Sequence, residues 1–152
     1  MDFLIDLLHN TVFVSAVLGW LVAQVIKTII HFIITKQFIA ERMVGGGGMP
    51  SSHSATVCAL ATATGIRYGG GSVEFAIAIM LAIIVMYDAM GVRRETGIQA
   101  KVINEMMEML TNMGSKMSVE DKLKEFVGHT PLQVLIGAIL GIIIAVIVNG
   151  LL

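Results

Sequence analysis

The chain has 152 residues, of which 56% are hydrophobic and 14% are charged, with a mean hydropathy of +0.86. Soluble chains carry roughly a quarter of charged residues, so the composition excludes a soluble domain and predicts one all-α integral membrane domain over residues 1–152. The net charge of −1 gives no indication of a nucleic-acid partner. The one cysteine, Cys58, lies in an apolar run, which excludes an internal disulfide and favours an inert buried thiol.

Four apolar segments approach the roughly 20 helical residues that cross a bilayer. They cover residues 12–34, 54–66, 73–90 and 131–152. The second is short and built from small residues, so it spans fully only if the bilayer thins or the helix extends through the preceding serines; a partly re-entrant helix is the alternative. The N-terminus reads MDFLID, without a basic region or a small-residue cleavage site, and no signal peptide is expected.

A charged insertion, residues 91–128, separates the third and fourth segments. Its apolar residues recur at near-helical spacing, which predicts an amphipathic helix over residues 95–112. Ser118, as an N-cap with Asp121 in the first turn, predicts a second short helix. Five methionines of this insertion favour a membrane-interface or dimer surface: Met106, Met107, Met109, Met113 and Met117.

Positive charge predicts the orientation of these spans. Residues 36–52 and 91–128 together hold eight of the ten lysines and arginines. By the positive-inside rule both loops face the cytoplasm, and both termini then face outside.

The segment that opens the second span, residues 45–55, reads GGGGMPSSHSA. Glycines allow a backbone to approach a ligand closely, and a helix N-terminus offers unpaired N–H groups to an anion. Ser51, Ser52 and His53 follow at that position. The segment therefore predicts an anion-binding turn, with a plain flexible loop as the alternative.

Chemistry-bearing residues converge on the predicted cytoplasmic face. His53 opens the second span, Arg93 and Arg94 follow the third, and His129 precedes the fourth. Arginine binds phosphate oxygens in bidentate fashion, and two histidines can divide nucleophile and general-acid roles. The set predicts a phosphate site. The alternatives are polar helix-end histidines and arginines that only fix topology.

Two ionisable residues fall inside predicted spans, where such groups are functional candidates. Lys27 is one, with snorkelling to the interface as the alternative. Asp88 is the other, as a candidate catalytic residue, with an ion pair to Arg93 or Arg94 as the alternative. His31 follows Lys27 by one turn, either facing the same cavity or lying at the interface.

These motifs resemble a known family. MPSSHSA resembles the PSGH motif of the type 2 phosphatidic-acid phosphatase and vanadium haloperoxidase superfamily. HTPLQVLIGAILG, residues 129–141, resembles its last motif, in which a histidine is followed by three residues, an aspartate and a small-residue-rich helix. With AQVIK and YDAMGVRRETG, the set is most similar to the divergent branch, a group of small bacterial and plant membrane proteins, over about residues 23–141.

The resemblance implies a lipid-phosphate phosphatase that works without metal or cofactor. His129 would be the nucleophile that forms a phosphohistidine, and His53 the general acid. Five residues would hold the substrate phosphate: Lys27, Ser51, Ser52, Arg93 and Arg94. Lys36 and Arg42 are the alternatives to Lys27.

The chain departs from the superfamily pattern at two places near the nucleophile. Gln133 stands where the aspartate that orients the histidine is expected. An amide can orient His129 but supplies no negative charge, so His129 should be a poorer nucleophile unless Asp88 or Glu95 supplies the carboxylate. In addition, 34 residues, 95 to 128, separate Arg94 from His129, where the superfamily has a few.

Four spans, against the usual six of the family's membrane members, predict a homo-oligomer, most simply a dimer, that closes the site. The expected location is a bacterial inner membrane, with lipid phosphate as substrate. Two other functions are alternatives: a non-catalytic protein that binds anionic lipid or phosphate, and a small transporter or channel.

Overall fold

The computed structural model describes residues 2–36, 48–113, 123 and 128–151, and all regular structure among them is helical. The six helices are α1 (Asp2–Leu8), α2 (Thr11–Thr35), α3 (Ser52–Tyr68), α4 (Val73–Met90), α5 (Val92–Asn112) and α6 (Pro131–Leu151). The expected all-α membrane bundle is confirmed. The expected short helix at Ser118, together with Arg42 and Met117, lies outside the described residues.

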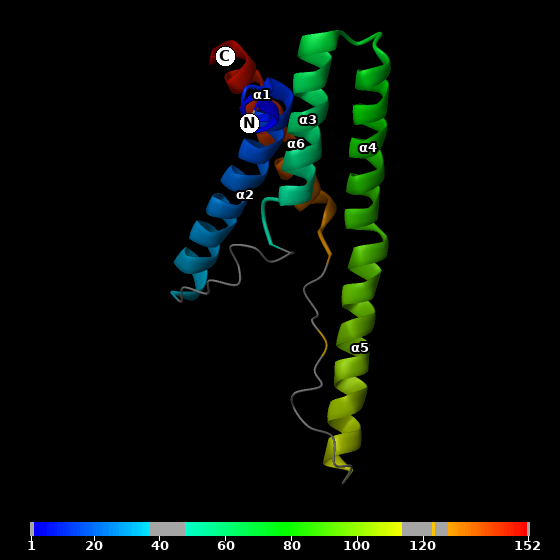
Figure 1. Cartoon of the computed structure of the whole chain (residues 1–152). Coiled ribbons are helices and arrows are strands. Elements are labelled where there is room, and N and C mark those ends of the chain that lie inside the picture. The colour runs from blue at the N-terminus through cyan, green and yellow to red at the C-terminus, as the bar shows by residue number, and fades with distance from the viewer. Residues whose placement is uncertain (1, 37–47, 114–122, 124–127, 152) are drawn as a thin grey trace.

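In the part of the chain that the structure describes, three helical stretches are long and apolar enough to cross a membrane: Thr11–Thr35, Val73–Asn112 and Pro131–Leu151. Between them lies α3, which contacts α2, α4 and α6 (Figure 1). Its 17 residues extend about 25 Å, longer than the predicted 54–66 because two more residues are helical at each end. The second expected span, residues 54–66, therefore lies in the central, most buried helix of the bundle.

Small residues allow α3 to occupy this central position. A Cβ on Gly137 would meet the carbonyl oxygen of Ser51, and one on Gly141 would meet that of Ala55. From the other side, a Cβ on Gly19 would lie 2.9 Å from the same Ala55 oxygen. The small-xxx-small pair of α6 thus packs helices within the chain, bringing α6 and α2 onto the α3 backbone.

Capping residues define several of the helix ends. The Asn10 side chain accepts the N–H groups of Val12 and Phe13 at the start of α2. The helix ends at Thr35, and its C-cap Lys36 lies in the left-handed region, φ 58°. Ser72 caps α4 through the N–H of Phe75. Gly91 separates α4 from α5 without a side-chain cap.

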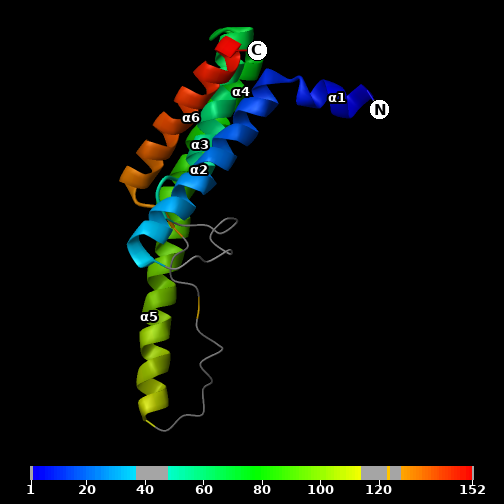
Figure 2. The same ribbon diagram turned by 90° about the vertical axis from the view of Figure 1, so that its left-hand side faces the viewer.

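The α5 helix continues the line of α4 and extends away from the bundle (Figures 1 and 2). It begins at Val92, three residues before the predicted start. The short α1, which the sequence did not predict, projects sideways from the opposite end with exposed Phe3, Leu4 and Leu8 (Figure 2). Both chain ends lie at that end of the bundle (Figure 1).

Candidate functional site

The candidate site lies at the end of the bundle opposite the termini, where α2 and α4 approach their ends and α3 and α6 begin (Figure 1). The predicted residues of the second, third and fourth segments come together there. The cluster includes a buried lysine, two buried serines and a pair of neighbouring histidines: Lys27, Ser51, Ser52, His53 and His129.

The first turn of α3 is fixed by Ser51, which is fully buried. Its hydroxyl oxygen accepts from the N–H of Ser54 at 3.3 Å and from the Ser54 hydroxyl at 3.0 Å, so it serves as the N-cap. Its own N–H donates to the carbonyl oxygen of Gln133 at 3.1 Å. Ser51 therefore joins the start of α3 to α6, whereas Ser52 presents its hydroxyl toward α2.

Lys27 lies inside the bundle, with 3% of its surface exposed. Its Nζ donates to Gln24 Oε1 at 2.7 Å and to Ser52 Oγ at 3.4 Å. Gly48, at φ +81°, covers its stem: a Cβ there would lie 3.3 Å from Lys27 Cγ. The ammonium group is held at the start of α3 rather than reaching to the interface, as snorkelling would require.

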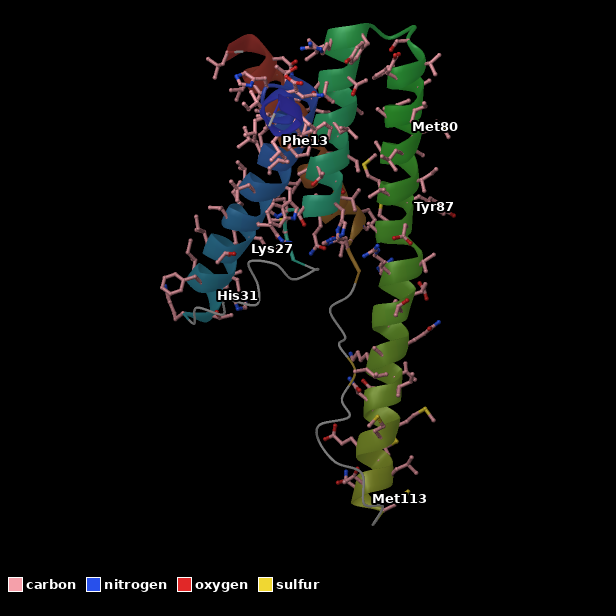
Figure 3. All side chains as sticks on the ribbon, in the orientation of Figure 1. Phe13, Lys27, His31, Met80, Tyr87 and Met113 are labelled. Carbon is pink, nitrogen blue, oxygen red and sulfur yellow. The ribbon has the colours of Figure 1, made fainter. Side chains whose placement is uncertain are left out.

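Gln24 is the member of this network that sequence reasoning missed. Its side chain is 4% exposed and lies one turn before Lys27, at the i, i+3 spacing of helical neighbours. The i, i+3 spacing of the glutamine and the lysine within AQVIK is the sequence feature from which Gln24 could have been predicted as a neighbour of Lys27. The alternative residue Lys36 is exposed and forms the C-cap of α2, nine residues beyond Lys27. His31 lies one turn beyond Lys27 on α2 (Figure 3), and its Nε2 has no partner among the described residues.

His129 is almost fully buried, with 1% of its surface exposed. Its backbone N–H donates to the carbonyl oxygen of Ala89 at 3.1 Å, which fastens the start of α6 to the end of α4. Its Nδ1 lies 3.3 Å from Gln133 Oε1, and the Thr130 N–H donates to the same oxygen at 3.0 Å. Because a backbone donor fixes that atom as the amide oxygen, Nδ1 of His129 must donate to it. The neutral ring then carries its lone pair on Nε2.

Burial is also the main cause that lowers the pKa of His129 below its ordinary value. The hydrogen bond with Gln133 opposes this change, while the charge of Lys27, neighbouring His53 and the charge of Arg93 add to it. The neutral imidazole is thus the favoured form near neutral pH. A neutral ring with a free Nε2 is the form that acts as a nucleophile.

His53 faces His129, with ring centroids 6.1 Å apart and ring planes at 60°. Its Nδ1 is buried and has no hydrogen-bond partner among the described residues. Buried polar atoms of this kind are uncommon and call for an explanation such as a catalytic role or a bound group. The two rings are near enough to contact one phosphate group between them.

The two arginines occupy different positions. Arg93 pairs through Nε with Asp88 Oδ2, both side chains being roughly half exposed. This is the ion pair that the sequence left as the alternative to a catalytic Asp88. Arg94 lines a cavity of about 490 Å³ together with His129 and Thr130.

Gly128 lies directly against the backbone of Arg94, where a Cβ would clash. Arg94 and His129 are therefore close in space despite the long insertion between them in the chain. The start of α3, Lys27 and Arg93 bring hydrogen-bond donors and positive charge near the two rings, which suits a phosphate dianion.

The fold and this cluster define an all-α integral membrane protein with a histidine-pair site at one end of its helix bundle. Residues 8–144 match the family described as the Divergent PAP2 family, and the chain belongs to it. The chain is also 36% identical over 151 residues to the "Uncharacterized membrane protein YuiD" of Bacillus subtilis (strain 168), covering 93% of this chain and 96% of that protein. No solved structure matches the chain.

Proposed function

We propose that the protein hydrolyses lipid phosphomonoesters through a phosphohistidine on His129, at the cytoplasmic leaflet. The observation that carries this proposal is the arrangement of His129: its Nδ1 is held by Gln133, and its ring faces His53 at 6.1 Å. One histidine then has a free Nε2 for attack, and the other is placed to exchange a proton with the leaving oxygen.

The reaction has two displacements. In the first, Nε2 of His129 attacks phosphorus, and the bond from phosphorus to the ester oxygen breaks as the N–P bond forms. His53 gives a proton to the departing oxygen, which leaves as the lipid alcohol. In the second, His53 takes a proton from water, the water oxygen attacks phosphorus, and inorganic phosphate leaves His129 neutral again.

The surrounding groups would stabilise the charge that develops on the phosphoryl oxygens. Lys27 and the Ser52 hydroxyl approach from α2 and the start of α3, where the helix also presents its positive dipole end. Arg93 approaches from the first turn of α5, and its charge reaches His129. The positive-inside distribution of lysine and arginine supports the cytoplasmic leaflet in this proposal.

Phosphate release by the purified protein tests the proposal, with phosphatidic acid, lysophosphatidic acid and hexadecyl phosphate as substrates. His129→Ala and His53→Ala should each reduce release by about 100-fold or more. His9→Ala is the matched control, since His9 lies at the opposite end of the bundle and bonds only to Ile5 among the described residues. Release that persists in His129→Ala would contradict the mechanism.

The second candidate is a protein that binds a lipid phosphate without hydrolysing it. Gln133 favours it, because an amide orients the imidazole but does not stabilise the imidazolium that a phosphohistidine requires. Saturable binding of phosphatidic acid with no phosphate release after long incubation would support this candidate and exclude hydrolysis.

A further inference from the structure

A second cavity, of about 440 Å³, opens among α3, α4 and α6 in the membrane-spanning part of the chain. Its walls come from small and apolar side chains of α3 and α4, with one contribution from α6: Cys58, Ala61, Gly65, Ile79, Ala82 and Ile142. We name this cavity the apolar groove.

The apolar groove begins beside the candidate site. Met86 lines its near end, and Cys58 there lies 3.7 Å from the Met86 sulfur. Met86 precedes Ala89 by three residues, about 4.5 Å along the helix axis, and Ala89 accepts the N–H of His129. The groove then extends to Gly70 and Phe75 at the other end of α4, so it covers about 16 Å of membrane depth.

The size of the apolar groove decides what can fill it. A helix with its side chains is about 10–12 Å across, and three turns would displace on the order of 1,500 Å³, far more than the groove offers. Its volume falls within the range of ligand pockets, about 300–1,000 Å³. The rim residues Ile79 and Ile142 are 37% and 45% exposed, so the groove opens sideways toward lipid and suits a single hydrocarbon chain.

We propose that the apolar groove holds the hydrocarbon chain of the phosphate ligand whose head group lies at His53 and His129; this inference rests on the proposed function. An occupant with a charged head and an apolar tail matches both parts: donors and positive charge at the cytoplasmic end, and an apolar wall leading away from it. The protein then selects phosphates that carry a long chain over short soluble ones.

Photocrosslinking tests the groove without turnover. The purified full-length protein in maltoside micelles is labelled with a hexadecyl phosphonate that carries a mid-chain diazirine and cannot be hydrolysed at the C–P bond. The expected label falls on the peptides that contain residues 58–66 and 75–86. Excess hexadecyl phosphonate should remove this label and butyl phosphonate should not. Label spread over all lipid-facing helices, with no effect of either competitor, overturns the proposal.

Two neighbouring isoleucines of α6 provide a matched pair of variants. Ile142 lines the apolar groove, whereas Ile143, of similar exposure at 49%, does not. Ile142→Trp should reduce groove labelling at least fivefold, and Ile143→Trp should leave it unchanged. Equal labelling of the two variants contradicts the assignment; if Ile142→Trp does not fold, labelling of the natural chain decides alone.

Comparison with turnover separates the two proposals. Groove labelling without release from any phosphate supports the groove and overturns hydrolysis. Release at equal rates from hexadecyl and butyl phosphate, with scattered label, supports hydrolysis and overturns the groove. Release that favours hexadecyl phosphate at least tenfold, lost in Ile142→Trp and kept in Ile143→Trp, supports both.

Discussion

The side-chain oxygen of Gln133 lies 3.3 Å from Nδ1 of His129 and also accepts the N–H of Thr130. An amide oxygen thus stands where the superfamily that the sequence motifs resemble has a carboxylate. It is positioned by two groups, the His129 ring and the Thr130 N–H. The orientation of the imidazole is retained while the negative charge is absent. Replacing this one group separates the effect of orientation from the effect of charge.

Gln133→Glu should increase kcat by about tenfold, because a carboxylate stabilises the imidazolium that forms as His129 is phosphorylated. It should also raise the pKa of His129, which burial lowers in the natural chain. Activity that needs neutral His129 is lost as pH falls through this pKa, so the acid limb of the pH–rate profile should move to higher pH. The measurement is kcat between about pH 4 and 8.

Gln133→Leu is the companion variant, and it removes orientation as well as polarity. It should lower kcat by about 10–100-fold, since Nδ1 then has no acceptor to fix the tautomer. An acid limb that stays in place in Gln133→Glu, or full activity in Gln133→Leu, would show that Gln133 does not act on His129.

Lys27→Met should weaken phosphate binding. The variant keeps the length of the stem and removes the ammonium group that lies 3.4 Å from Ser52 Oγ. We expect KM for hexadecyl phosphate to increase by about 10–100-fold, as for loss of a charged hydrogen bond of roughly 1.5–3 kcal/mol. Lys36→Met, at the exposed end of α2, is the control and should leave KM unchanged. Equal effects of the two variants would remove Lys27 from the site.

Asp88→Asn should change activity by less than about threefold if the carboxylate only pairs with Arg93 at the surface. Arg93→Leu should have the larger effect, because its charge reaches His129. Initial rates at saturating and at low substrate distinguish the two variants. A loss of about 100-fold or more in Asp88→Asn would instead assign Asp88 the catalytic role that the sequence suggested.

Gly141→Ala should destabilise the bundle by about 1–3 kcal/mol, because the added methyl group meets the carbonyl of Ala55. Gly150→Ala on the same helix has open space around it and should have little effect or a small stabilising one. Thermal unfolding in detergent compares the two variants directly. An unchanged midpoint for Gly141→Ala would contradict this prediction, because it would mean that α3 and α6 accommodate the methyl group with no loss in the free energy of unfolding.

The sequence predicted the main helices because long apolar runs in a membrane protein have one stable backbone form. The α2 and α4 bounds agree with the expected 12–34 and 73–90 to within a residue at each end. The 54–66 segment was predicted too short because its small residues contribute little hydropathy. Their small size is nevertheless what allows α3 to occupy the central position. α1 was missed because seven residues carry too little pattern to predict a helix.

The candidate site was predictable as a gathering of helix ends, but its internal contacts were not. Spacing alone could not choose between Lys27 and Lys36, since only packing determines which ammonium is buried. Gln24 is uncharged and therefore did not stand out in the sequence. Its role as a hydrogen-bond acceptor for Lys27 is evident only in the structure. The pairing of Asp88 with Arg93 rather than Arg94 depends on the turn at Gly91.

The contact between Gly128 and Arg94 joins the two ends of the long insertion. The chain leaves the site at Arg94, extends along α5 and comes back to its point of departure, so the ends of the excursion touch. Distance along the sequence and distance across the site are therefore uncoupled. The separation between the arginine and the histidine is set by this contact and not by the number of residues in the excursion.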